Sequence, residues 1–131
     1  MLADSQAFSG FAVDDLAAAR RFYGDTLGVD VAEEMPGLLT LRLGGGTNVI
    51  VYEKPDHTPA TFTILNFPVE DIDRSVEELA RRGVRFERYE GFEQDEKGIA
   101  RPARQDQGPP IAWFKDPAGN ILAILEGASD A

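Results

Sequence analysis

The chain contains an internal duplication. Residues 11–29, FAVDDLAAARRFYGDTLGV, recur in altered form as residues 67–84, FPVEDIDRSVEELARRGV. The two copies are offset by 56 residues at Phe11 and Phe67, but by 55 residues at the glycines near their ends, so the second copy lacks one residue in its helical part. A repeat of this length predicts two copies of one supersecondary unit in tandem.

Each copy has the same local pattern: an apolar run, an acidic pair, and apolar residues at helical spacing that end at a glycine. The apolar runs are residues 7–13 and 61–69, the acidic pairs are Asp14 with Asp15 and Glu70 with Asp71, and the glycines are Gly28 and Gly83. Acidic residues cap a helix N-terminus and complement its dipole, whereas glycine takes the left-handed conformation after the last turn. We therefore expect a strand followed by a helix in each copy.

Three strand candidates follow each helix. They are residues 29–34, 38–43 and 48–53 in the first half, and residues 84–90, 111–115 and 120–126 in the second half. Glycine and proline mark the turns between them, as at residues 35–37 and 44–46. The predicted fold class is therefore α+β, with two βαβββ modules at residues 5–54 and 60–127 and a linker at residues 55–59.

Only the second half carries residues 90–109, a charged insertion that contains glycine. A long loop in a small domain is more often functional than idle, but this composition is also typical of a solvated loop. A lid over a ligand and a disordered crossing are equally compatible with the sequence.

The segment WFKDPAGNILAILE, residues 113–126, predicts a strand, a tight turn and a second strand. Pro117 presets the first corner of the turn, Gly119 allows a positive φ, and Asp116 is placed to accept a backbone hydrogen bond. The strand after the turn is apolar on both faces, and such a strand is covered on both sides. The alanine at position 123 stands in the middle of this strand.

Composition limits the possible partners and the compartment. Aspartate and glutamate outnumber lysine and arginine by 23 to 13, which gives a formal net charge of −10. This charge repels nucleic acids and anionic membranes and mildly favours cationic ligands. The chain has no cysteine, no secretion signal and no apolar run long enough to cross a bilayer, so we expect a cytoplasmic protein. Its 131 residues predict one domain, residues 1–131.

These motifs together resemble a known family. The VDDL stretch at residues 13–16, the paired aromatics Phe22 and Tyr23, the following Leu27 and Gly28, and the closing WFKDPAGNIL at residues 113–122 are similar to the vicinal oxygen chelate superfamily. That superfamily includes glyoxalase, bleomycin-resistance proteins, extradiol dioxygenases and fosfomycin-resistance enzymes. The resemblance implies a curled mixed sheet around a cleft and a homodimer.

The resemblance also implies a divalent metal held by one ligand from each of four strands. The matching positions in this chain are Phe8, Val51, Ile64 and Ala123, and none of these side chains donates a lone pair. A shift of one residue brings in Ser9, Ile50 or Tyr52, Leu65, and Leu122 or Ile124, which does not restore a metal site. The single histidine, His57, lies in the linker and is interpreted as a surface residue. We expect no metal and no other cofactor.

Strand alternation then predicts which side chains line the cleft. The predicted cleft residues are Phe8, Thr40, Arg42, Val51, Glu53, Phe62, Ile64, Asn66, Trp113 and Ala123, with Arg101 or Arg104 as further polar candidates from the insertion. Arg42 is expected to pair with Glu53. The predicted core on the opposite strand faces comprises Phe11, Val13, Leu39, Leu41, Leu43, Ile50, Leu65, Phe67, Val69, Leu122 and Ile124.

The leading functional hypothesis is a metal-free, dimeric protein of the bleomycin-resistance type that binds a small organic molecule, cationic or aromatic, in an apolar cleft. The first alternative is a metal-dependent enzyme similar to glyoxalase or to a dioxygenase. A metal-independent enzyme that uses Arg42 or Glu53 with an organic cofactor, and an interaction module whose cleft is filled by its own side chains, are the others.

Overall fold

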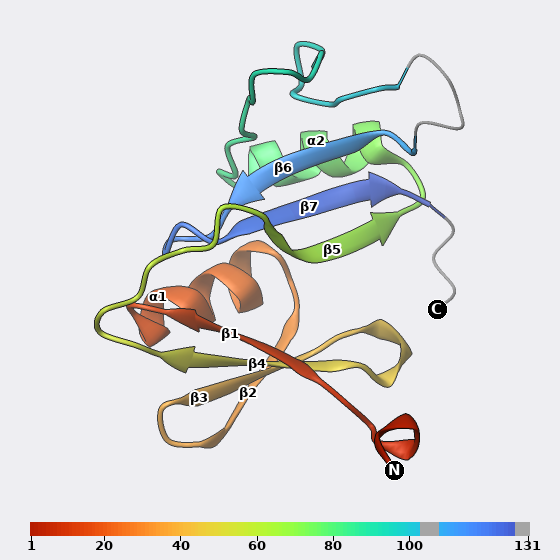
Figure 1. The fold of residues 1–131 in the computed structure, drawn as a ribbon. Coiled ribbons are helices and arrows are strands. Elements are labelled where there is room, and N and C mark those ends of the chain that lie inside the picture. Colours follow the sequence, from red (N-terminus) through yellow and green to blue (C-terminus); the bar gives the residue numbers. More distant parts are fainter. Residues whose placement is uncertain (103–107, 128–131) are drawn as a thin grey trace. The chain divides into compact units, whose positions relative to one another are not determined.

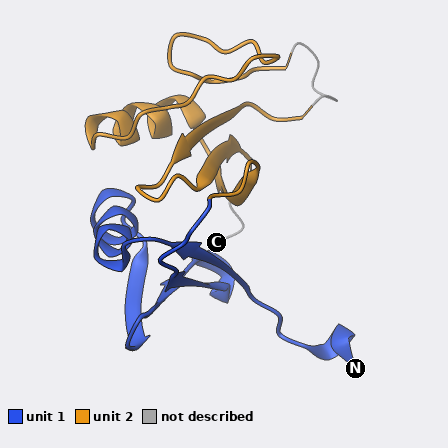
Figure 2. Ribbon diagram, turned by 60° about the vertical axis from the view of Figure 1, so that its left-hand side comes forward, with its two compact units in different colours: residues 1–58 blue, residues 59–131 orange. Residues whose placement is uncertain are grey.

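A computed structural model describes residues 1–102 and 108–127. The chain divides into two compact units, unit 1 at Met1–Thr58 and unit 2 at Pro59–Ala131 (Figure 2). Each unit contains one β-sheet of parallel and antiparallel strands together with helical segments. The α+β class and the tandem arrangement of two similar modules are thus confirmed.

Unit 1 holds a four-stranded sheet in the order β1-β4-β3-β2, in which β1 and β4 are parallel and the other pairs are antiparallel (Figure 1). Its elements are η1 (Leu2–Asp4), β1 (Ser9–Val13), α1 (Leu16–Arg20), η2 (Arg21–Thr26), β2 (Asp30–Met35), β3 (Leu38–Arg42), η3 (Gly44–Gly46) and β4 (Asn48–Glu53).

Unit 2 holds a three-stranded sheet in the order β5-β7-β6, in which β5 and β7 are parallel and β6 and β7 are antiparallel. Its elements are β5 (Thr63–Val69), α2 (Ile72–Arg81), β6 (Ile111–Lys115) and β7 (Ile121–Glu126). In both units the first strand is parallel to the last, which is the same topology twice.

The predicted strand at residues 84–90 was wrong. This segment pairs with β6 only at an isolated bridge between Phe86 and Phe114 and through the amide of Glu87, which donates to the Trp113 carbonyl at 2.8 Å. Beyond that point, backbone groups form hydrogen bonds with the Gln94 side chain. This side chain donates to the Glu87 carbonyl and accepts from the Tyr89 amide, both at 2.9 Å. A strand neighbour is therefore not needed to satisfy them.

The predicted acidic caps are confirmed at the N-termini of both helices, and each N-terminus has a second carboxylate acceptor. Asp15 accepts from the Ala18 amide and Asp71 from the Arg74 amide, both at 3.1 Å. In addition, the last strand of each module sends a glutamate to the same helix terminus: Glu53 accepts from the amide of Leu16, and Glu126 from the amide of Ile72, both at 3.1 Å. The duplication is thus repeated in the hydrogen bonds.

The residue by which the two copies differ coincides with a π-helical segment. α1 continues into η2, in which the Leu27 amide donates to the Phe22 carbonyl five residues earlier, at 2.9 Å. The shorter second copy forms the regular helix α2. A single extra residue in a helix is commonly accommodated by such a wider turn. Gly28 and Gly83 then take positive φ values of 75° and 95°, as predicted.

The turn at residues 116–119 has the predicted chemistry. The buried Asp116 carboxylate accepts from the amides of Ala118 at 3.0 Å and Asn120 at 2.8 Å, and from the Asn120 side chain at 3.0 Å. Gly119 has a φ of 87°. The turn is therefore fixed by one acidic side chain below the surface.

The first part of the insertion is attached to α2 by ion pairs. Lys97 Nζ lies 3.1 Å from Asp73 Oδ1 and 2.8 Å from Glu77 Oε1, and Arg101 Nη2 lies 2.7 Å from Asp73 Oδ1. The other oxygens of this network belong to Asp95, which binds Arg101 at 3.3 Å and accepts from the Lys97 amide at 2.9 Å. Residues 90–102 are thus tied to the domain and are not a disordered crossing.

We expect Asp73→Asn to loosen this attachment, raising hydrogen exchange at the Lys97 and Ile99 amides by up to about fivefold, because exposed ion pairs contribute little individually. Hydrogen bonds from Arg101 and then from Lys97 lower the pKa of Asp73 below its ordinary value of 3.8. A carboxyl group whose pKa falls on folding stabilises the folded state above its unfolded pKa. The protection of the Lys97 and Ile99 amides should therefore decrease as the pH drops below the unfolded pKa of Asp73 and through its lower folded pKa.

Glu78→Gln is the matched control, because Glu78 pairs with Arg81 and Arg82 at the end of α2 and not with the insertion. Equal exchange in the two variants would contradict an ionic attachment of the insertion.

Candidate functional site

The two faces of the sheet in unit 1 differ sharply. One face packs on the helical segment, where the Phe11 and Tyr23 rings lie 5.7 Å apart. Strand register places Val51 opposite Phe11 and Leu39, so all three share this helix-covered face. The other face, which we call the open face of unit 1, carries residues of the opposite parity: Gly10, Ala12, Leu38, Thr40, Arg42, Asn48, Ile50 and Tyr52.

An open hollow of about 590 Å³ lies over the open face of unit 1. Its lining residues are Gln6, Ala7, Phe8, Glu34, Thr40, Gly46, Thr47, Asn48 and Ile50. The Phe8 side chain is largely uncovered, with 65% of the residue exposed, whereas Thr40 is buried in the sheet. The hollow therefore combines one exposed aromatic ring with hydroxyl, amide and carboxylate groups.

The predicted pairing of Arg42 with Glu53 was wrong. Arg42 lies on the open face of unit 1, where it binds Glu34 at 3.1 Å and Asp30 at 3.7 Å. Glu53 has the opposite parity and accepts from the Leu16 amide at the start of α1. A residue that caps a helix is not available on the other side of the sheet.

The predicted orientation of Val51 was also wrong. Val51 has no exposed surface and shares its face with Phe11, whereas Ile50, assigned to the core, lines the hollow. Both faces of β4 are largely apolar, so alternation alone does not tell which one the helix covers. The error is one residue in register, which turns every side chain of a strand to the other face.

In unit 2 the register agrees with the predicted grouping of Asn66, Trp113 and Ala123. Trp113 lies opposite Ala123, and Ala123 opposite Asn66, so the three share one face, while Leu122 and Ile124 have the other parity. We call the face of Ala123 the Trp113 face. Ala123 is fully buried there, in a cluster with Trp113 and Ala100 that Tyr89, Ile111 and Ile121 surround.

The remaining predicted residues of unit 2 lie at the margins. Ile64 is half-buried at an irregularity in the pairing of β5, and Phe62 precedes β5 with its ring largely exposed. Arg101 is bound to Asp73 and Asp95, and Arg104 lies outside the described residues.

Sequence reasoning missed two aromatic residues of the insertion, Tyr89 and Phe92. Their ring centroids lie 5.5 Å and 4.9 Å from that of Trp113. The only local signal was the pair of aromatic residues within a charged loop. Contact with a strand more than twenty positions away is decided by tertiary packing.

The donor set does not fit the metal that the family implies. The side chains of Phe8, Ile64 and Ala123 have no atom that can bind a metal, and Val51 is fully buried on the helix-covered face. Within residues 1–102 and 108–127, no group of three or more histidine, cysteine, aspartate or glutamate side chains is placed to hold a metal ion. His57 is half-buried, not simply exposed as predicted, and its Nε2 forms no hydrogen bond with the described residues.

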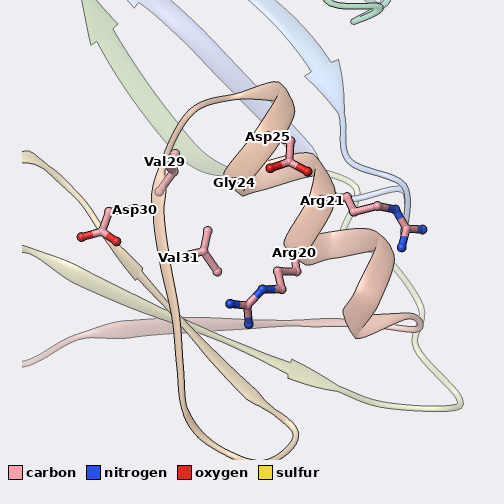
Figure 3. A pocket seen from close by; sticks show the side chains of 7 residues that line it. All are labelled: Arg20, Arg21, Gly24, Asp25, Val29, Asp30 and Val31. Atoms are coloured by element: carbon pink, nitrogen blue, oxygen red, sulfur yellow. The ribbon is translucent and has the colours of Figure 1, made fainter.

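A second hollow, of about 450 Å³, lies beside η2 and includes Arg20, Arg21, Asp25 and Val31. Figure 3 shows the Arg20 and Val31 side chains directed toward each other, and Arg21 directed away from them. Arg20 is engaged by Glu33 at 3.3 Å. The hollow contains none of the predicted cleft residues.

Residues 7–124 match the family model described as Glyoxalase/Bleomycin resistance protein/Dioxygenase superfamily. The chain belongs to this superfamily. The match spans both modules, and it confirms the resemblance drawn from the duplication and the closing hairpin. Among curated proteins, none is similar in sequence to this chain.

Solved structures of other proteins share the fold over nearly the whole chain. The antibiotic-binding protein TnmS3 from Streptomyces sp. CB03234 is 22% identical with a TM-score of 0.66, and the alignment covers 95% of this chain and 98% of that one. A superfamily member from Sphaerobacter thermophilus DSM 20745 is 25% identical with a TM-score of 0.68, covering 96% and 100%. A bleomycin-binding protein complexed with bleomycin is 21% identical with a TM-score of 0.66, covering 95% and 99%.

In the described part of this superfamily member, no helix is both long enough and apolar enough to span a membrane.

Proposed function

We propose that this protein binds a small organic molecule without a metal, as a cytoplasmic homodimer. The observation that carries the proposal is the chemistry of the positions where the resemblance implies metal ligands. Phe8, Ile64 and Ala123 have no donor atom, and a shift of one residue in β4 replaces Val51 by Ile50 or Tyr52 without supplying a carboxylate or imidazole.

The hollow over unit 1 supplies what a binding site needs in place of a metal. On the open face of unit 1, Phe8 is exposed beside Thr40 and Asn48. Small-molecule sites typically combine apolar and aromatic walls with a few polar anchors. The antibiotic-binding and bleomycin-binding functions named for two proteins of the same fold support this class of ligand.

Native mass spectrometry of untagged protein tests the proposal directly. We expect a dimer without a stoichiometric divalent metal. We also expect EDTA to leave the thermal midpoint unchanged, because residues 1–102 and 108–127 contain no group of side chains placed to hold a metal ion. A stoichiometric metal that EDTA removes, with a fall in the midpoint, would instead favour the metal-dependent enzyme.

The same measurement also shows where a ligand binds, when bleomycin or a panel of small aromatic amines is added and variants are compared with the wild-type protein. Ile50→Arg fills the hollow over unit 1 and should weaken binding there. Met35→Arg is the matched control, since Met35 is an exposed apolar residue outside the lining of the hollow. If none of the added molecules binds the wild-type protein, the binding function loses its support.

A further inference from the structure

The insertion places an aromatic ring over the single tryptophan of the chain. The Phe92 ring centroid lies 4.9 Å from that of Trp113 at an interplanar angle of 55°, and Tyr89 meets Trp113 edge-on at 5.5 Å and 75°. These separations are in the range of favourable aromatic pairs. Trp113 is only 9% exposed, whereas Phe92 is 55% exposed. The outer surface of this aromatic stack therefore belongs to Phe92.

Hydrogen bonds fix the loop that carries Phe92. The Gln94 amide group donates to the carbonyls of Glu87 at 2.9 Å and Gly98 at 2.8 Å, and its oxygen accepts from the Tyr89 amide at 2.9 Å. The side chain of Gln94 thus forms hydrogen bonds with the backbone both before and after Phe92. A ring held in this way loses little conformational freedom when a ligand stacks on it.

The residues that flank Phe92 in the sequence carry negative charge. Glu90 and Glu93 flank it, both are exposed, and neither forms an ion pair with any residue that the structure describes. The nearby cations are engaged elsewhere: Arg88 donates to the Asp95 carbonyl at 2.7 Å, Lys97 and Arg101 bind Asp73, and Lys115 lies 3.7 Å from Glu87.

The Tyr89 hydroxyl is the polar group on the inner side of the aromatic stack, and its charge state matters for the ligand. Burial and then the negative charge of Glu87 raise the pKa of Tyr89, so the phenol stays neutral. Its oxygen is buried and forms no hydrogen bond with the described residues. The inner side of the stack therefore presents a neutral hydroxyl group.

We propose that the ring of Phe92, backed by Trp113 and flanked by Glu90 and Glu93, is a stacking platform for a flat aromatic cation. A positively charged ring gains from the face of an aromatic side chain and from the two carboxylates beside it. This inference rests on the proposed function and names its ligand class. It also gives the insertion, which the first module lacks, a role in selecting the ligand.

Titration with proflavine, a flat aromatic cation, tests the platform. Acridine, a ring system of the same size that is neutral at neutral pH, is the comparison. We expect proflavine to quench the emission of Trp113 and to bind about tenfold more tightly than acridine, with Phe92→Ala weakening proflavine binding by about tenfold. Quenching of the only tryptophan reports that binding occurs, and the Phe92 variant shows whether it occurs at this place.

Charge variants separate the platform from the general acidity of the protein. Glu90→Gln with Glu93→Gln should weaken proflavine binding by about fivefold at low salt and leave acridine binding unchanged. The double control Asp14→Asn with Glu70→Gln removes two exposed negative charges that lie outside residues 90–109 in the sequence, and it should have little effect. Phe92→Leu, which keeps an apolar side chain of similar bulk, guards against a folding defect in Phe92→Ala.

Each result decides the inference. Loss of binding in Phe92→Ala, partial loss in Phe92→Leu and an unchanged far-UV spectrum support the platform. Equal binding of proflavine to wild-type protein and both Phe92 variants overturns the platform, but leaves the proposed binding function intact because the ligand then binds elsewhere. No binding of proflavine to the wild-type protein also overturns the platform, while the mass-spectrometric panel independently decides the binding function.

Discussion

Val51→Asp should unfold the protein or destabilise it by more than about 4 kcal/mol, because the new carboxylate would lie in a fully apolar position. Val51 has no exposed surface and lies in register with Leu39 on one side and Phe11 on the other. The carboxylate must therefore either bury its charge or take up a proton, and both cost free energy.

Tyr52→Asp, one position further along β4, is the matched variant. Tyr52 is 40% exposed and points to the open face of unit 1. We expect a loss below about 1 kcal/mol there, as for other partly exposed sites. Urea denaturation followed by circular dichroism compares the two. If Val51→Asp were as stable as Tyr52→Asp, Val51 would face solvent, and the register described for β4 would be incorrect.

Asp116→Ala should cost about 3 kcal/mol, since it removes three hydrogen bonds to one buried carboxylate. Asp116 is 4% exposed and holds the amides of Ala118 and Asn120 and the side chain of Asn120. The substitution leaves these donors without that acceptor in a position that water reaches poorly. We expect a lower denaturation midpoint with an unchanged slope, because the fold itself is retained.

Asp56→Ala provides the comparison for Asp116→Ala. Asp56 also lies in a turn, but it is exposed, and its carboxylate binds the nearby Lys54 at 2.7 Å. Its replacement should leave the midpoint within experimental error. Equal losses in the two variants would mean that turn formation, and not the buried hydrogen bonds of Asp116, limits stability.

Local chemistry in the sequence predicted much of the fold. The acidic caps at Asp15 and Asp71, the glycine ends of the helices and the Asp-Pro-Ala-Gly turn depend on residues within four positions of one another. The duplication added the topology, because two similar segments adopt similar folds. The absence of metal-ligand side chains at Phe8, Ile64 and Ala123 was likewise readable from the sequence alone.

The composition of the site was only partly predictable. Trp113, Ala123 and Asn66 were grouped correctly on one face, whereas Val51 and Glu53 were placed on the wrong side of β4. A strand that is apolar on both faces gives no signal about which face a helix will cover. The hydrogen bond from the Leu16 amide to Glu53 shows that Glu53 lies on the helix-covered side of β4, and it therefore determines which residues of β4 face that side.

The sequence by itself therefore predicted the two modules, the acidic helix caps at Asp15 and Asp71 and the closing turn, since each depends on neighbouring residues or on repetition along the chain. Tertiary structure alone decided which face of β4 is covered and that Phe92 rests on Trp113. These features arise from contacts between residues far apart in sequence, whose energies depend on packing and are not encoded in any local pattern.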